Sequence, residues 1–250
     1  MNRENTLFAV VGLLLGYAAA FTLVVYLNQG QPASRAAQGA GGASGEQTTV
    51  AVKEQQRLQS EAELAAQKAR QEPENFDAQV AAANASVGAN DYEGAIDFLT
   101  RANKLRPDDY ETLIMLGRAN FEAQRFDVAG RWYTNALKRK PDDLDARSEL
   151  ALTYFLRTPP DVDRAVSEFN AALSRDPSHE MTLHNMTLVF IQAGRLKEAE
   201  ATLARLEKAS PQNEKLPMLR ERLKEARAGG GKSPGETTPG GGAQKKTPTD

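Results

Sequence analysis

Residues 107–140 read PDDYETLIMLGRANFEAQRFDVAGRWYTNALKRK, and residues 141–176 read PDDLDARSELALTYFLRTPPDVDRAVSEFNAALSRD. Both stretches begin with Pro-Asp-Asp and carry apolar residues at helical spacing on either side of a polar turn. Prolines mark the same boundary along most of the chain, at positions 73, 107, 141, 177 and 211. Their spacings of 34, 34, 36 and 34 residues indicate an internal repeat with two helices per unit.

A series of alanines follows the same period. Alanines at positions 95, 129, 165 and 199 are 34, 36 and 34 residues apart, and a bulky apolar residue follows each of them four positions later. This spacing places a small and a large residue on one helix face. The 36-residue unit contains the turn sequence TPPD at residues 158–161, which predicts a two-residue insertion between its two helices.

This pattern resembles the tetratricopeptide repeat (TPR) family over residues 76–213. The small residue on the first helix of the family's unit corresponds to Ala83, Gly117 and Ala151. The resemblance implies an all-α fold, a right-handed α-α superhelical solenoid in which each helix pair buries its apolar stripe against its neighbours. The four predicted units span residues 76–109, 110–143, 144–179 and 180–213.

The first and last units depart from the family pattern. Gln79 and Ser86 occupy positions where large apolar residues are usual, and Thr187 and Leu206 occupy positions for small residues. We therefore expect the end units to pack less tightly than the interior ones. The acidic pairs that follow the repeat prolines precede predicted helices, where negative charge stabilises the helix N-terminus.

Two further helices are predicted at the ends of the repeat array. Residues 50–72 contain helix formers with Leu58 and three alanines on one face, which predicts an N-terminal capping helix or half-repeat. Residues 214–227 place three leucines at helical spacing among charged residues, as expected of a solvating C-terminal capping helix. Residues 28–49 form a predicted flexible Gly/Ala/Ser linker, and residues 228–250 a disordered tail.

The N-terminal segment is apolar. Residues 6–27 carry no charge, and 22 residues in a helix extend about 33 Å, enough to cross the hydrocarbon core of a membrane. This predicts a single transmembrane helix that acts as a signal-anchor. A cleaved signal peptide is the competing interpretation, because residues 18–20 (AAA) offer a cleavage site. The apolar run continues to Leu27, which a removable segment does not need.

The residues around this span set its expected orientation and association. Arg3 and the α-amino group precede the span, which favours a cytoplasmic N-terminus. We therefore expect a bacterial inner-membrane protein with periplasmic repeats. Gly12, Gly16 and Ala20 recur at every fourth position, which allows close helix contact and favours a homodimer through the transmembrane helix.

The composition excludes several classes of function. The 250 residues carry 31 Lys and Arg against 33 Asp and Glu, a net charge of −2, which argues against nucleic-acid binding. The chain has no cysteine, and its two histidines, His179 and His184, lie about 140° apart around a helix, so they cannot share a metal ion. No catalytic constellation is recognisable. We expect no enzymatic activity, no cofactor and no metal site.

The family resemblance implies that the first helix of each unit lines a concave groove, which binds a peptide or helix of a partner protein. Arg118, His184 and Asn185 are the candidate polar anchors, with Arg118 facing a ligand carboxylate and Asn185 a ligand backbone. The alternative is that neighbouring helices, including residues 50–72, already bury the apolar groove residues. The candidate groove residues are Asn84, Ile114, Arg118, Phe121, Leu152, Phe155, His184, Asn185, Leu188 and Ile191.

These features predict a membrane-anchored protein–protein interaction scaffold. The layout is similar to the anchored repeat modules of c-type cytochrome maturation, which hold an apoprotein segment, and this is one alternative. A self-associating structural membrane protein with an occluded groove is the other. Binding of acidic chaperone tails is disfavoured, because Asp145 and Glu149 occupy positions where the repeats that bind such tails carry basic residues.

Overall fold

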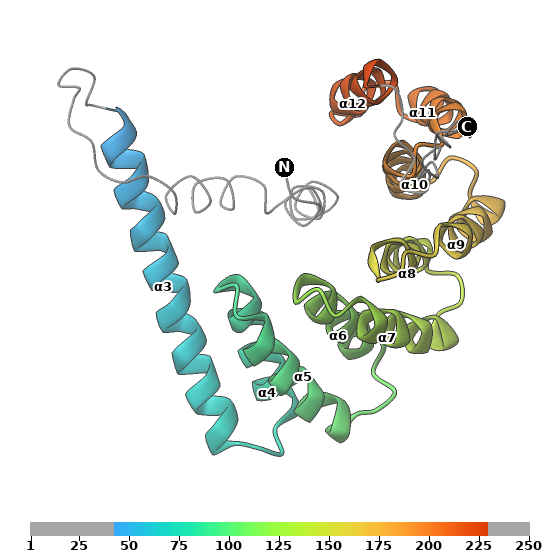
Figure 1. Cartoon of the computed structure of the whole chain (residues 1–250). Helices are drawn as coiled ribbons and strands as arrows, with labels where there is room; N and C mark the ends of the chain where they lie inside the picture. Colours follow the sequence, from blue (N-terminus) through green and yellow to red (C-terminus); the bar gives the residue numbers. More distant parts are fainter. Residues whose placement is uncertain (1–42, 230–250) are drawn as a thin grey trace, which may run out of the picture. The chain divides into compact units, whose positions relative to one another are not determined.

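A computed structural model describes residues 43–229, and all regular secondary structure in that range is helical (Figure 1). Within each repeat unit, the two helices are joined by a short turn and pack as antiparallel neighbours. The helices are α3 (Ala43–Gln71), α4 (Phe76–Gly88), α5 (Tyr92–Leu105), α6 (Tyr110–Glu122), α7 (Phe126–Arg139), α8 (Leu144–Leu156), α9 (Val162–Arg175), α10 (Glu180–Gln192), α11 (Leu196–Ala209) and α12 (Leu216–Ala228).

Acidic and amide side chains fix where many of these helices begin. Asp109 Oδ1 accepts a hydrogen bond from the backbone N–H of Thr112 at 2.8 Å, and Asp143 Oδ1 accepts one from Ala146 N–H at 2.8 Å. Asn75 caps α4 in the same way. Such caps satisfy backbone donors that a helix N-terminus otherwise leaves free. The acidic pairs after the repeat prolines therefore have the structural role that the sequence predicts.

The helix pairs coincide with the four predicted units, since α4, α6, α8 and α10 begin at residues 76, 110, 144 and 180. Within three units, the turn between the helices contains a left-handed residue at the equivalent position: Asn90 with φ of 62°, Gln124 with 59° and Gly194 with 73°. The third unit has residues 158–161 there instead. Its longer loop is closed by a hydrogen bond of 2.8 Å from Asp161 N–H to the Tyr154 carbonyl.

The N-terminal capping helix is longer than predicted. Helix α3 begins at Ala43, so residues 43–49 belong to a helix and the expected linker over 28–49 ends earlier. The predicted transmembrane helix over 6–27, with Gly12, Gly16 and Ala20, lies outside the described residues, as do residues 230–250 of the predicted tail. Among the described helices, none is both long and apolar enough to cross a membrane.

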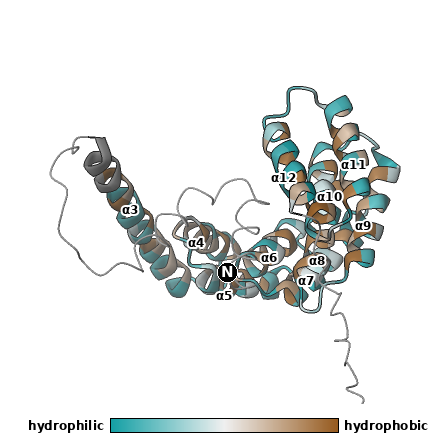
Figure 2. Ribbon diagram, turned by 45° about the horizontal axis from the view of Figure 1, so that its top comes forward, coloured by the Kyte–Doolittle hydropathy of each residue, from teal (hydrophilic) through white to brown (hydrophobic). Residues whose placement is uncertain are grey.

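The chain divides into two compact units, Met1–Pro177 and Ser178–Asp250. In the first, α3 to α9 pack in chain order; in the second, α10, α11 and α12 pack together. Figure 2 shows hydrophilic and hydrophobic residues alternating along each helix, as expected of amphipathic helices. The contact between α3 and α4 is rich in alanine, including Ala66, Ala69, Ala78 and Ala82, so these two helices approach closely.

The four residues behind the expectation of looser packing in the end units are buried in the structure. Gln79, Ser86, Thr187 and Leu206 are all at most 2% exposed. Gln79 and Thr187 are accommodated by hydrogen bonds. Gln79 Nε2 donates to the Ala69 carbonyl at 2.7 Å, and the Thr187 hydroxyl donates to the Leu183 carbonyl at 2.7 Å.

Candidate functional site

The predicted groove residues all lie on the first helices of their units. The first compact unit holds six of them: Asn84 on α4; Ile114, Arg118 and Phe121 on α6; Leu152 and Phe155 on α8. The second compact unit holds four, all on α10: His184, Asn185, Leu188 and Ile191.

The apolar groove residues of the first compact unit are buried. Ile114, Phe121, Leu152 and Phe155 are each at most 9% exposed. Phe121 packs edge-to-face on Phe126, the first residue of α7, with 5.3 Å between ring centroids. Little apolar surface of these side chains is therefore open to a partner. The accessible groove residues of this unit are polar, Asn84 and Arg118.

Arg118 is held by a carboxylate of the next unit. Its Nη2 and Nε atoms both lie 3.0 Å from Glu149 Oε1, and Glu149 stands on α8, one first helix further along. The Arg118 side chain is 57% exposed, whereas that of Glu149 is 13% exposed. The partner that the sequence assigns to Arg118 is a ligand carboxylate, but in the structure Glu149 already occupies that place.

Further acidic groups surround this pair. Burial raises the pKa of Glu149, and the positive charge of Arg118 opposes that rise. Burial, together with the charge of Glu149, also raises the pKa of Glu122 on α6. Asp145 lies within electrostatic reach of Glu149 as well. The face around Arg118 therefore carries more carboxylates than cations, and it suits a neutral or basic ligand better than an acidic one.

In the second compact unit, His184, Asn185 and Leu188 are buried and Ile191 is half-buried. Burial, together with the positive charges of Lys215 and Arg222, lowers the pKa of His184 to about 4. The His184 ring is therefore neutral at physiological pH. A neutral ring at this depth is better suited to packing against the capping helix than to binding an anion.

Sequence reasoning identified Arg118 but missed its partner. Glu149 follows Arg118 by 31 residues, close to one repeat, so both residues fall on the first helices of adjacent units. This spacing is the signal that could have paired them. The role of Tyr133 was also missed: its ring is buried against Gly117 and near Glu149, so an outer-helix residue reaches the groove side of α6.

No group of metal-ligating side chains occurs among residues 43–229. A family model described as "Tetratricopeptide repeat" matches residues 86–147 and 161–223, which is half of the chain. The chain therefore belongs to the tetratricopeptide repeat family, as the sequence resemblance indicated. This family and the helical solenoid of the described residues identify a protein–protein interaction scaffold.

Three solved structures have a fold similar to that of this chain. YrrB, described as a TPR protein with an unusual peptide-binding site, is 17% identical with a TM-score of 0.55, over 82% of this chain and 98% of that one. MamA is 18% identical with a TM-score of 0.53, over 68% and 96% of the two chains. A tetratricopeptide repeat protein from Parabacteroides merdae is 19% identical with a TM-score of 0.52, over 62% and 60%. At these identities the likeness concerns the fold alone, and a comparison with curated proteins gave no match.

Proposed function

We propose that this protein is a membrane-anchored scaffold whose first helices bind a peptide or helix of a partner protein. The observation that carries the groove proposal is the Arg118–Glu149 pair, which joins the first helices of two adjacent units and leaves Arg118 more than half exposed. A paired, positioned guanidinium on the face where TPR repeats bind ligands is a ready hydrogen-bond donor. The peptide-binding description of YrrB supports the same class of ligand.

The charges on this face define the ligand further. A ligand carboxylate would have to displace Glu149 from Arg118 and would face Glu122 and Asp145. A backbone carbonyl or a basic side chain meets no such repulsion, because Arg118 donates to the first and Glu149 attracts the second. The ligand that binds the groove of the first compact unit is therefore a neutral or basic segment, and Asn84 hydrogen-bonds to its backbone.

A photo-reactive amino acid placed in the full chain tests the groove. Reporters at Asn84 and Arg118 face the proposed ligand, whereas one at the exposed Lys104, on the second helix α5, is the control. We expect a partner adduct at positions 84 and 118 that is at least tenfold more abundant than at 104. Equal adducts at all three positions would contradict a groove site.

The anchor is tested separately. If residues 6–27 span a membrane, the full chain stays in the membrane fraction after a carbonate wash, and recovery of a soluble form that begins near Phe21 would instead indicate cleavage. If the repeats are periplasmic, protease added to inverted inner-membrane vesicles leaves residues 43–229 intact. Rapid digestion would place the repeats on the cytoplasmic side.

A further inference from the structure

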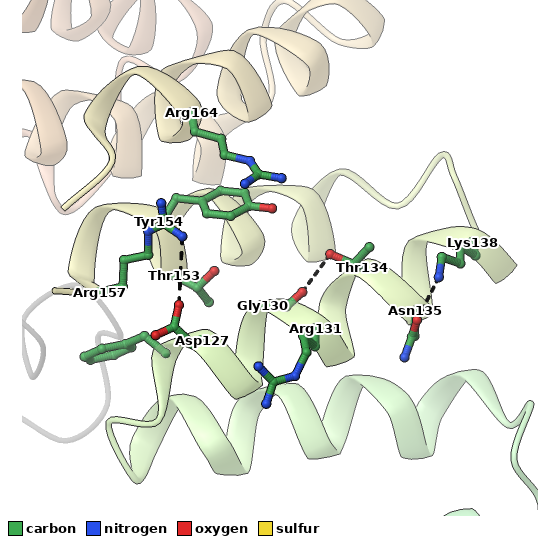
Figure 3. Close-up of a pocket in the computed structure, with 11 residues that line it drawn as sticks. Asp127, Gly130, Arg131, Thr134, Asn135, Lys138, Thr153, Tyr154, Arg157 and Arg164 are labelled. Carbon is green, nitrogen blue, oxygen red and sulfur yellow. Dashed lines mark hydrogen bonds and ion pairs between the residues drawn. The ribbon is translucent and has the colours of Figure 1, made fainter. Parts of the chain in front are cut away.

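A second, chemically different cleft lies between α7 and the α8–α9 helix pair. Its volume is about 650 Å³, within the range of ligand-binding pockets. None of the ten predicted groove residues lines it. Figure 3 shows Tyr154, Arg157 and Arg164 facing a row of side chains along α7, the second helix of its unit. The residues of α7 in this row include Asp127, Arg131, Thr134, Asn135 and Lys138.

The charge of this cleft is opposite to that of the face around Arg118. Four cationic side chains line it, Arg131, Lys138, Arg157 and Arg164, against the single carboxylate of Asp127. Among the described residues, Arg157 has carboxylate partners, Asp161 at 2.9 Å and Asp127 at 3.9 Å. No described carboxylate forms an ion pair with the other three cations, so their charge is available to a ligand.

Several of the lining side chains are held in place. Arg157 is fixed by Asp161, which also caps α9 by accepting the Arg164 N–H at 3.1 Å. The Arg164 guanidinium lies 4.3 Å from the centre of the Tyr154 ring, a cation–π contact that orients it. Arg157 and Asp161 flank residues 158–160 of the two-residue insertion. The insertion therefore adjoins the cleft through Arg157.

The floor depends on a close approach between α7 and α8. A Cβ atom on Gly130 would lie 2.9 Å from Thr153 Oγ1, so only glycine permits this contact. Thr134 donates to the Gly130 carbonyl at 2.7 Å, which leaves its oxygen free to accept a hydrogen bond. Asn135 Oδ1 accepts from Lys138 at 3.0 Å, which leaves the Asn135 amide group to donate.

We infer that this cleft binds an extended acidic segment of a partner protein. Arg131 and Lys138 are seven residues apart on α7, about 10 Å along the helix axis, and Arg157 and Arg164 stand on the opposite wall. A compact anion can contact only some of these four cations at once. Carboxylates on alternate residues of an extended peptide recur about every 7 Å and contact several of these cations at once. Thr134 and Asn135 then hydrogen-bond to the peptide backbone.

The test uses the full chain and a fluorescein-labelled eight-residue peptide of alternating Asp and Ala. The control ligand has Asn in place of each Asp, and inorganic phosphate is the compact competitor. The test variant is Arg131→Glu with Arg164→Glu, two exposed residues without a carboxylate partner. The control variant, Lys53→Glu with Arg70→Glu on α3, changes the net charge equally at a distance from the cleft.

We expect the Asp peptide to bind at least tenfold more tightly than the Asn peptide. The cleft variant weakens its binding at least tenfold, the α3 variant less than twofold, and Arg131→Lys with Arg164→Lys retains binding within about threefold. Circular dichroism verifies that each variant is folded. Equal losses in the cleft and α3 variants, or equal binding of both peptides, would overturn the inference.

Two further outcomes would also overturn it. Displacement of the peptide by submillimolar phosphate would assign the cleft to a compact anion. Loss of Asp-peptide binding in Arg118→Ala would assign the acidic ligand to the groove. The inference does not depend on the proposed groove function, because photo-adducts at positions 84 and 118 and binding at the cleft are measured with separate probes.

Discussion

The second repeat unit and the end units solve the same packing problem with different chemistry. In the second unit, Gly117 allows the buried ring of Tyr133 to lie directly against α6. In the end units, buried polar groups occupy the interior: Gln79 in the first, and Thr187 and His184 in the fourth. The second unit also buries Thr112 and Asn120, but its Gly117–Tyr133 contact depends on shape. In the end units, Gln79 and Thr187 are held by hydrogen bonds, and His184 is buried as a neutral ring whose nitrogens have no partner among the described residues. The interior should therefore be sensitive to volume, and the ends to polarity and pH.

The largest expected effect is a loss of stability in the second repeat unit. A Cβ atom at position 117 would lie 2.6 Å from Tyr133 Cε1, and leucine adds three more carbons in the same direction. Gly117→Leu should destabilise the fold by about 3 kcal/mol, the upper part of the range for overpacked cores. Urea unfolding measures this effect. Gly88→Ala is the control, because its Cβ would meet only Leu58 Cδ2 at 3.8 Å, and its stability should change by less than about 0.5 kcal/mol.

The next effect concerns pH and the fourth unit. The pKa of His184 falls from 6.5 to about 4 on folding, so between these values the unfolded chain binds a proton that the folded chain does not. The stability that this group contributes is complete above pH 6.5 and is lost as the pH falls toward 4. Between pH 7 and pH 4.5 the loss amounts to about 2 kcal/mol.

The variant His184→Leu isolates this contribution, because it keeps an apolar side chain at the site and removes the titrating ring. Urea unfolding at pH 7 and pH 4.5 should show a smaller acid-induced loss in this variant than in the wild type, by about 2 kcal/mol. Parallel pH profiles would contradict the buried, neutral state of His184.

The third prediction concerns the first unit. Gln79 Nε2 donates to the Ala69 carbonyl at the end of α3, while Gln79 Oε1 is buried without a partner among the described residues. Gln79→Ala removes the bond and leaves a cavity, and should cost about 1 to 2 kcal/mol. Gln79→Met keeps the volume but leaves the buried Ala69 carbonyl without this donor, so it should cost nearly as much as Gln79→Ala, about 1 to 2 kcal/mol. If Gln79→Met retains wild-type stability in urea unfolding, the volume and not the hydrogen bond holds this position.

The difference between interior and ends also marks what the sequence could predict. The 34-residue period located every helix pair, and the family pattern matched Gly117 to the small-residue position of the first helix. The polar residues at the ends were interpreted as packing defects, because a pattern of residue types does not reveal their hydrogen-bond partners. Gln79 reaches a carbonyl ten residues back on another helix, which only the folded chain shows.

The site was less predictable for a related reason. The pattern placed the groove residues on the correct helices, but it could not tell how much of each side chain its neighbours cover. Phe121 is covered in part by Phe126, and Arg118 is paired across a unit boundary with Glu149. The cleft on α7 escaped notice, because three of its cations, Arg131, Lys138 and Arg164, lie on second helices. The fourth, Arg157, is the C-cap residue of α8, next to the insertion.

The smallest effect compares the same turn position in two units. Gln124 adopts φ of 59°, where a side chain is disfavoured, while Gly194 occupies the equivalent position with φ of 73°. Gln124→Gly should stabilise the protein by about 0.5 kcal/mol, the relief of backbone strain being partly offset by the greater freedom of glycine in the unfolded chain. Gly194→Gln should destabilise it by about 1 kcal/mol, since a Cβ there meets nothing within 4 Å and only the backbone resists. Melting temperatures of the two variants should shift in opposite directions.

Helix α3 gives the molecule a mechanical property. Its 29 residues make a rod of about 43 Å, and its contacts with the first unit run from Gln55, which donates to the Ala89 carbonyl at 3.2 Å, to Ala69. The turns before Gln55 extend past the end of α4 as a stiff arm (Figure 1). A force applied at the N-terminal end of α3 would therefore act on the alanine-rich contact between α3 and α4 before it reached the interior units.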